Sequence, residues 1–316
     1  MSIKLSRTDL LVLCVMLIWA GSFSVVKYAL REMGPLSFAT VRFGTASVML
    51  LAWVWVSEGK PVIRRGDWVR VILVGLTAVG VYQVFWTVGL GFTTASNSSL
   101  MLATIPAWTA MFAAAAGQER IGLWQVVGLL LSFVGVALTV GGSGDGFQLA
   151  RDSVRGDALT LVAAALSAAS TVLSRRLLSR YSALRMMSLS MLCGSIFLLA
   201  VSVPQMVTED WAHLSSGTWL ALAFSAVPAA GLAYVIWFKS IGEIGASKTV
   251  IYNNLIPPMA ILIAFTTLGE RFTPVQALGA LVILLGVALT RFAHANEVPP
   301  KPAVAVAEGD DTASRG

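Results

Sequence analysis

Residues 135–139 read Gly-Val-Ala-Leu-Thr, and the same five residues return 151 positions later at 286–290. Four further matches at this shift are Ile105-Pro106 with Ile256-Pro257, Glu119-Arg120 with Glu270-Arg271, Gly80 with Gly231 and Trp86 with Trp237. Near the start of the chain the shift is 148, and it pairs Arg7, Asp9 and Ser22 with Arg155, Asp157 and Ser170. Shared apolar composition does not explain matched Pro, Glu-Arg and Trp residues. The chain is therefore predicted to contain one structural unit twice.

The composition places both units in a membrane. Of 316 residues, 57% are hydrophobic and 12% are charged, whereas an average soluble protein is about 45–50% apolar and about 25% charged. Such a chain lacks the polar residues needed to cover a water-facing surface. This excludes an ordinary soluble enzyme, a disordered protein and a nucleic-acid-binding domain, and the net charge of +6 is explained by basic loops on one side of a membrane.

Apolar segments of about 20 residues, the length that crosses a bilayer, recur along the chain. The ten expected spans are residues 9–30, 36–57, 68–90, 95–117, 121–140, 157–177, 183–204, 217–238, 246–268 and 274–293. The expected fold is an all-α integral membrane protein of ten transmembrane helices, arranged as two inverted five-helix repeats. The expected divisions are a first repeat at 1–142, a linker at 143–156, a second repeat at 157–293 and a disordered cytoplasmic tail at 294–316.

The odd number of spans in each repeat indicates a transporter. A second copy of five spans enters the membrane from the opposite side, so the two copies are antiparallel. Many secondary transporters are built from such inverted repeats, with a central site that alternates between the two sides. The alternative is a duplicated packing unit without a transport role.

Lys and Arg residues are distributed unequally between the two sides of the expected bundle. With the N-terminus in the cytoplasm, sixteen fall in cytoplasmic segments, five fall on the opposite side and Arg42 lies within a span. Basic residues are enriched on the cytoplasmic side, so both termini are predicted to be cytoplasmic.

Several short motifs point to a known family. The first span carries Trp19-Ala20-Gly21-Ser22-Phe23 with Lys27, the second carries Val41-Arg42-Phe43, and each half has a Pro-bearing span, a Glu-Arg turn and a Gly-rich closing span. Over about residues 8–292 the chain resembles the EamA type of the drug/metabolite transporter superfamily. The resemblance implies a ten-helix bundle that exports or exchanges small metabolites, often amino acids, across the bacterial inner membrane. In the second half Ser167 replaces Trp19 and no basic residue replaces Arg42, which suggests that the first half makes more of the specific polar contacts.

Two basic residues within spans are candidates for substrate binding. Charged groups inside a bilayer are costly and usually face a cavity or a partner. Arg42 lies about six residues into its span, and Lys27 about four residues from the end of its span. A carboxylate contact in a cavity is the functional interpretation of both. The alternative is a side chain that snorkels to the interface or pairs with a neighbouring helix.

Aromatic and amide side chains near the middle of spans complete the expected site. Asn97, Met101, Thr104 and Trp108 are spaced by 4, 3 and 4 residues, so they share one face of a continuous helix. The equivalent segment of the second half contains Lys248, Tyr252, Asn253 and Asn254. The other substrate-binding candidates are Trp19, Tyr82, Gln83, Trp86 and Tyr234. Helix packing through hydrogen bonds is the alternative role for the amide residues.

Three prolines, Pro106, Pro228 and Pro257, lie inside spans, where each removes a backbone hydrogen bond and kinks the helix. Pro106 and Pro257 are equivalent in the repeat. They are candidate hinges for alternating access, or fixed bends that shape a cavity.

Sequence motifs for other activities are absent. The chain has no P-loop, no HExxH, no CxxC and no paired carboxylates within spans, so we expect no enzyme activity, no cofactor and no metal. No span shows a convincing buried Asp or Glu for proton coupling, so the coupling mode is left open. The expected partners are a small-molecule substrate and the lipid bilayer, with no nucleic acid. The sequence predicts no oligomeric state, and a monomer is one of the alternatives. A membrane-embedded enzyme or lipid-handling protein, and a non-transporting sensor or assembly subunit, remain the alternatives to a secondary transporter that exports small metabolites.

Overall fold

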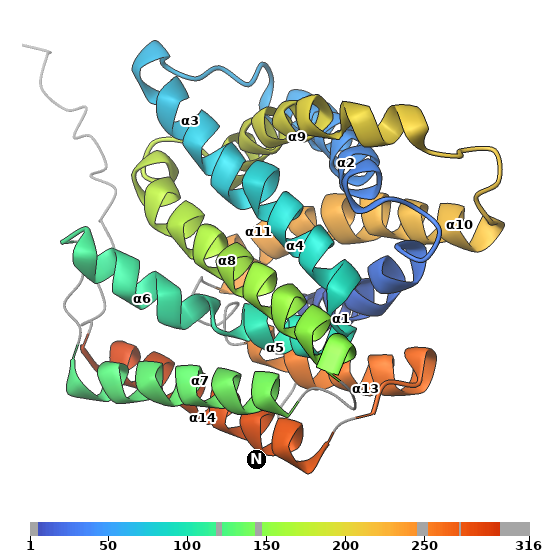
Figure 1. The fold of residues 1–316 in the computed structure, drawn as a ribbon. Coiled ribbons are helices and arrows are strands. Elements are labelled where there is room, and N and C mark those ends of the chain that lie inside the picture. The colour runs from blue at the N-terminus through green and yellow to red at the C-terminus, as the bar shows by residue number, and fades with distance from the viewer. Residues whose placement is uncertain (1–5, 118–121, 143–146, 245–251, 272, 298–316) are drawn as a thin grey trace, which may run out of the picture.

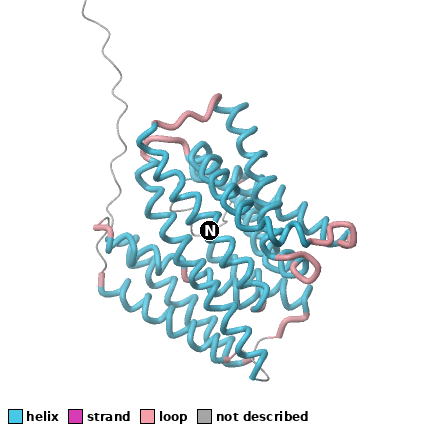
Figure 2. Tube along the Cα trace, turned by 45° about the horizontal axis from the view of Figure 1, so that its top comes forward, coloured by secondary structure: helices cyan, strands magenta, loops and turns pink. Residues whose placement is uncertain are grey.

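A computed structural model shows only helices and their connections in the residues that it describes, which are all except 1–5, 118–121, 143–146, 245–251, 272 and 298–316 (Figure 1). Viewed as a tube, these residues form one bundle of helices joined by short loops (Figure 2). The first half contains α1 (Arg7–Ala29), α2 (Pro35–Glu58), η1 (Arg65–Asp67), α3 (Trp68–Gly75), η2 (Leu76–Gly80), α4 (Val81–Phe92), α5 (Ala95–Ala103), α6 (Ile105–Ala115) and α7 (Leu123–Gly141). The second half contains α8 (Phe147–Leu178), α9 (Ala183–Thr208), α10 (Ser216–Phe224), η3 (Ser225–Leu232), α11 (Ala233–Ile244), η4 (Tyr252–Leu255), α13 (Ile256–Leu268) and α14 (Pro274–Glu297).

The length and hydropathy of the helices support a membrane protein. In the part of the chain that the structure describes, seven continuous helical segments are long and apolar enough to cross a bilayer, and three shorter apolar helices cover Leu123–Thr139, Ile256–Leu268 and Pro274–Leu289. The expected all-α membrane fold is confirmed, while the number of ten spans stays a prediction.

Two helices extend beyond the spans expected at 157–177 and 274–293. Helix α8 begins at Phe147, inside the segment 143–156 that was expected to be a linker, and α14 continues to Glu297, inside the segment expected to be a disordered tail. In α8 the extension contains Arg151, Asp152 and Arg155, and these charged residues lie before the apolar segment from which the span was expected, although the helix is continuous. The rest of the tail lies outside the described residues.

Equivalent helices of the two halves pack antiparallel, as inversion requires. Helices α7 and α14 lie side by side (Figure 1), and their glycines meet in opposite order: Gly135 faces Ile283, whereas Gly286 faces Ser132. In α2 and α9 the hydroxyls of Ser47 and Ser195, which are equivalent at the shift of 148, lie 2.8 Å apart. The pseudo-two-fold axis therefore passes between α2 and α9.

Both halves interrupt the same helices at the same places. The π-helical segments η2 and η3 are equivalent, and π-helical turns often mark functional sites. The span expected at 95–117 is split into α5 and α6 at Thr104, two residues before Pro106. Its counterpart is split before Pro257, where η4 meets α13. The two breaks therefore lie at equivalent positions of the repeat.

Carboxylates in the connecting loops hold the helix starts of the other half. Glu32 accepts hydrogen bonds from Ser215 and Thr218 at the start of α10, and these bonds, led by the one from Thr218, lower the pKa of the Glu32 carboxyl. Glu209 accepts from the backbone N–H of Gly34, and Glu270 from those of Ala95 and Ser96. Negative charge is favourable at a helix N-terminus. These three carboxylates therefore have a structural role: each one ties a loop of one half to a helix start of the other.

Candidate functional site

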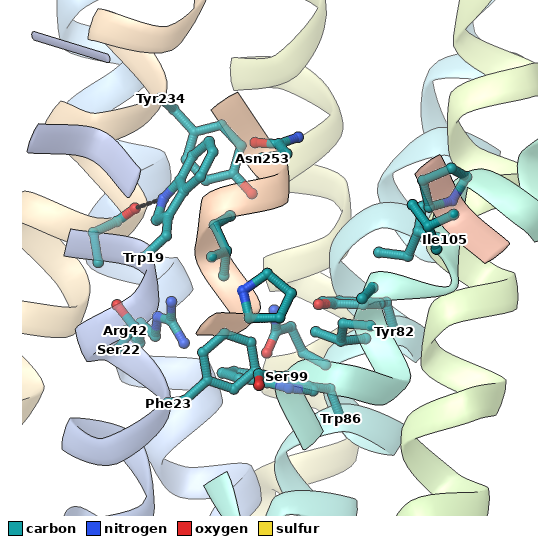
Figure 3. A pocket seen from close by; sticks show the side chains of 18 of the residues that line it. Trp19, Ser22, Phe23, Arg42, Tyr82, Trp86, Ser99, Ile105, Tyr234 and Asn253 are labelled. Atoms are coloured by element: carbon teal, nitrogen blue, oxygen red, sulfur yellow. Dashed lines mark hydrogen bonds between the residues drawn. The ribbon is translucent and has the colours of Figure 1, made fainter. Parts of the chain in front are cut away.

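A cavity of about 270 Å³ lies where the helix breaks of both halves meet (Figure 3). The residues that line it are Trp19, Ser22, Phe23, Arg42, Phe43, Tyr82, Gln83, Trp86, Ser99, Leu102, Ala103, Ile105, Pro106, Ala229, Tyr234, Asn253, Ile256, Pro257, Leu284 and Val287. Most are apolar or aromatic, and a few polar groups point inward. This composition is typical of a site for a small organic ligand.

Equivalent positions of the repeat meet across this cavity. The lining includes the pairs Ile105 and Ile256, Pro106 and Pro257, Leu102 and Asn253, and Gln83 and Tyr234. The cavity is therefore located on the pseudo-two-fold axis, the position that an alternating-access site occupies in inverted-repeat transporters. At two of these pairs a residue in one half differs in polarity or shape from its counterpart.

Among the described residues, Arg42 is the only charged one in the lining of this cavity, and it is 7% exposed. Helix α2 places its guanidinium over the rings of Phe43 and Trp86, at 4.9 and 5.4 Å from their centroids. Its Nε donates to the carbonyl oxygen of Ser225 in η3 at 3.2 Å. Its Nη1 is buried without a hydrogen-bond partner among the described residues. A buried donor of this kind costs free energy until a ligand or water accepts from it.

Aromatic rings form two groups along the cavity wall. Trp19 lies 5.5 Å from Tyr234 between ring centroids, and its indole N–H donates to the carbonyl oxygen of Ala229 at 3.0 Å. Trp86 contacts Phe23 edge to face at 5.8 Å and stacks on Tyr82 at 6.4 Å. The carbonyls of Ser225 and Ala229 both come from η3, so the π-helical segment holds Arg42 and Trp19 in place.

A buried acceptor complements the donor on Arg42. Asn253, in η4, lines the cavity, and its Oδ1 is buried without a hydrogen-bond partner among the described residues. Figure 3 shows Asn253 next to Tyr234 and apart from Arg42. The cavity thus offers a cationic donor and a neutral acceptor at separate points of an aromatic enclosure.

Nine of the residues singled out from the sequence line this cavity. They are Trp19, Arg42, Tyr82, Gln83, Trp86, Tyr234 and Asn253, together with Pro106 and Pro257 at the helix breaks. The residues that the structure places elsewhere are Lys27, Asn97, Met101, Trp108, Tyr252 and Pro228. Lys248 lies outside the described residues.

The expected stripe from Asn97 to Trp108 is wrong as a cavity wall. It presumes one continuous helix, but the break at Thr104 assigns Trp108 to α6, where it packs on Phe133 at 5.1 Å. Met101 is fully buried among residues of α7 and α14. The opposite side of α5, with Ser99, Leu102 and Ala103, faces the cavity.

Three other candidates also lie away from the cavity. Lys27 donates from Nζ to the carbonyl oxygens of Leu90 and Gly91 at 2.7 and 3.0 Å, so it caps the end of α4. Tyr252 donates its hydroxyl to Asp9 at 2.9 Å. Pro228 lies within η3, one residue before the cavity residue Ala229.

Sequence reasoning also overlooked several lining residues and one buried acid. Ser22 and Phe23 belong to the first-span motif and were recognisable from it, and Ile105 and Ile256 belong to a matched pair of the repeat, whereas Ser99, Ala103 and Leu284 carry no distinguishing pattern. Asp157 is fully buried in α8, so the expectation that no convincing carboxylate is buried in the spans is wrong. Asp157 does not line the cavity.

Comparison with known proteins identifies the family of the chain. Residues 6–141 and 154–292 each match the EamA-like transporter family. An Archaeoglobus fulgidus protein named as an uncharacterized transporter is 30% identical over 288 residues, which cover 90% of this chain and 97% of that protein. A Bacillus subtilis protein, named "Uncharacterized transporter YyaM", is 30% identical over 269 residues, which cover 84% of this chain and 88% of that protein.

One relative has a name that specifies a cargo. A Streptantibioticus cattleyicolor protein, named "Probable terminal-alkyne amino-acid exporter", is 27% identical over 293 residues, which cover 90% of this chain and 94% of that protein. A crystal structure with 19% sequence identity superposes with a TM-score of 0.64 over 93% of this chain and 100% of its own. At that identity the likeness supports the fold alone.

Proposed function

The chain belongs to the EamA-like transporter family, and from this premise we propose that it is a secondary transporter that exports small metabolites bearing a carboxylate, such as amino acids or related compounds. Transport takes place by alternating access through the central cavity. The observation that carries the proposal is the unpartnered Nη1 of Arg42 inside that cavity.

The chemistry of the lining supports this substrate class. A carboxylate accepts hydrogen bonds from a guanidinium in a charge-assisted, often bidentate geometry. The free Oδ1 of Asn253 suits a donor such as an ammonium group. The rings of Trp19, Phe23 and Trp86 suit an apolar body between these two ends.

The two halves support the transport mechanism. Because the repeats are inverted, the helix break at Pro106 has an equivalent break at Pro257 in a helix that runs in the opposite direction. If each half can adopt the conformation of the other, the exchange of these conformations would open the same cavity first to one side of the membrane and then to the other. Pro106 and Pro257 then act as fixed bends or as hinges in that exchange.

We propose that the protein resides in the bacterial inner membrane with both termini in the cytoplasm. Sixteen Lys and Arg residues against five support this orientation. The relatives are named as transporters, and these names support a non-enzymatic role. We also propose that the chain divides into a first repeat at 1–142 and a second at 157–293.

Counterflow in liposomes tests the proposal. The full chain is reconstituted and loaded with unlabelled amino acids from a broad panel, and the entry of the labelled compound is measured. Ala103→Trp fills the cavity, so it should abolish counterflow that the wild-type protein supports. Ala52→Trp, at an exposed position of α2, is the matched control and should transport normally. If no carboxylate compound exchanges, or if both variants transport equally well, the proposal fails.

A further inference from the structure

Asp157 is a fully buried carboxylate that lies apart from the cavity. It occupies the end of the bundle where α4 ends and α5 begins, called here the Asp157 end. Thr93 donates to its Oδ1 at 2.5 Å, and Asn97 donates from Nδ2 to its Oδ2 at 3.3 Å. Both partners are neutral, and an ionised carboxylate with only neutral partners is costly to keep out of water.

Helix packing excludes water from this end. A Cβ added at Gly156 would lie 2.6 Å from the backbone nitrogen of Thr93, and one added at Gly89 would lie 2.9 Å from the carbonyl oxygen of Gly156. The backbones of α4 and α8 are therefore in direct contact beside Asp157. Water could reach the carboxylate only if these helices moved apart.

The charged groups around this end are engaged elsewhere. Lys27 of α1 donates to the carbonyls of Leu90 and Gly91, and Glu270, after α13, accepts from the first N–H groups of α5. Arg155, on α8 itself, lies over the ring of Phe92 at 4.6 Å. From α14 the polar side chain that faces the cluster is Gln276, while α6 and α7 carry no titratable residue. Within the described part of the chain, Asp157 forms no ion pair.

The same contacts connect Asp157 to the cavity wall. Asn97 is bonded to Asp157 and accepts from Nε2 of Gln276 at 3.4 Å. Asn97 belongs to α5, and the other side of this short helix carries Ser99 and Leu102, which line the cavity. A change at Asp157 therefore acts directly on a helix that lines the cavity.

We propose that Asp157 is a proton-binding site that couples transport to proton movement. The proton adds to a carboxylate oxygen and neutralises it, and no other covalent bond changes. The hydroxyl of Thr93 then turns from donor to acceptor, which a hydroxyl can do at the same position. The neutral acid stays between α5 and α8 and keeps this end closed; the ionised acid favours an open end, where water reaches it. The coupling part of this proposal rests on the proposed transport function.

Infrared spectroscopy tests the proton site without any substrate. In the full chain in lipid bilayers, a protonated buried carboxyl has its own C=O stretching band, and this band should develop and disappear with pH. Asp157→Asn should remove the band. Asp152→Asn, the same change at an exposed position of the same helix, should leave it in place. Thr93→Val, which keeps the carboxylate and removes one donor, should change the pH at which the band develops. A band that is missing from the wild-type protein, or that persists in Asp157→Asn, overturns the proposal.

Transport of leucine, as a probe amino acid, tests the coupling. With one proton exchanged per leucine, a gradient of about one pH unit should drive about tenfold accumulation at equilibrium in the wild type and in Asp152→Asn. Asp157→Asn should retain leucine counterflow and lose this accumulation. Accumulation in Asp157→Asn, or a response of the wild type to sodium in place of pH, contradicts proton coupling. Absence of all leucine counterflow contradicts the proposed function for this substrate, while the infrared result still decides the proton site.

Discussion

The two halves of the chain share helix order, helix breaks and close-packed glycines, yet they contribute unequally to the cavity. The first half supplies Trp19, Arg42 and Trp86 to the lining. The equivalent positions of the second half hold Ser167, Ser190 and Trp237, which do not line it. Duplication explains the framework and its axis, whereas the polar and aromatic lining of the cavity comes largely from one copy.

This difference separates two kinds of equivalent positions. Positions that maintain the framework should respond equally to the same substitution in either half. Positions that recognise the substrate should respond unequally. Substitutions at pairs of equivalent residues therefore distinguish framework positions from positions that recognise the substrate.

The largest effect is expected at Arg42. Arg42→Gln removes a charged donor from a buried site, where a hydrogen bond to a charged group contributes about 1.5–3 kcal/mol, so substrate affinity should fall about 10- to 100-fold. Ser190→Ala, at the equivalent buried position between α9 and α3, should leave affinity unchanged. Counterflow measured over a range of substrate concentrations gives both values. Equal losses in the two variants would remove the functional difference between the halves.

The next effect concerns the framework, where the halves should behave alike. A Cβ on Gly135 or on the equivalent Gly286 would lie 2.5 Å from a backbone nitrogen of the facing helix. Overpacking typically costs about 1–3 kcal/mol, so Gly135→Ala and Gly286→Ala should each lower the free energy of unfolding by about that amount. Gly21→Ala is the control, because no atom lies within 4 Å of its added Cβ. Chemical denaturation of the purified variants in detergent measures the three values. A large difference between Gly135→Ala and Gly286→Ala would show that the two closing helices are not packed equivalently.

A smaller effect is expected at Asn253, whose counterpart is Leu102. Asn253→Leu makes this pair symmetrical and removes one neutral acceptor, worth about 1 kcal/mol, so affinity for an amino acid should fall about fivefold. Leu102→Ala, which removes apolar contact without removing an acceptor, should affect amino acids and their deaminated analogues alike. Counterflow of the two compounds distinguishes these results. If Asn253→Leu weakens both compounds equally, Asn253 does not accept from an ammonium group.

The sequence alone predicted the features that leave a local or repeated pattern, namely the inverted repeat and two of the residues that line the cavity. The matched motifs predicted inversion, and the packing of α7 against α14 confirms it. Arg42 was recognisable because a charge within a span is rare, and Trp19 because a tryptophan near the middle of a span departs from the interfacial preference. The structure places both in the cavity; their binding role stays a prediction.

The remaining parts depend on contacts between distant segments. A helical period placed Met101 and Trp108 on one face, and the break at Thr104 turned them apart. Asp157 stood at the first residue of an expected span, where a carboxylate reaches water. The ten preceding residues continue the helix, and contact between α4 and α8 covers it. Pro106 predicted a kink in this span but not the direction in which it turns Trp108, and the contact that buries Asp157 leaves no local pattern in the sequence.

The central claim is that Arg42 binds the carboxylate of the transported compound. It is tested most directly by comparing leucine with leucinamide as competitors of counterflow, in the wild type and in Arg42→Gln. The account predicts that the wild type prefers leucine by about 10- to 100-fold, the contribution of one charge-assisted contact, and that Arg42→Gln shows almost no preference. The same preference for leucine in both proteins would contradict it.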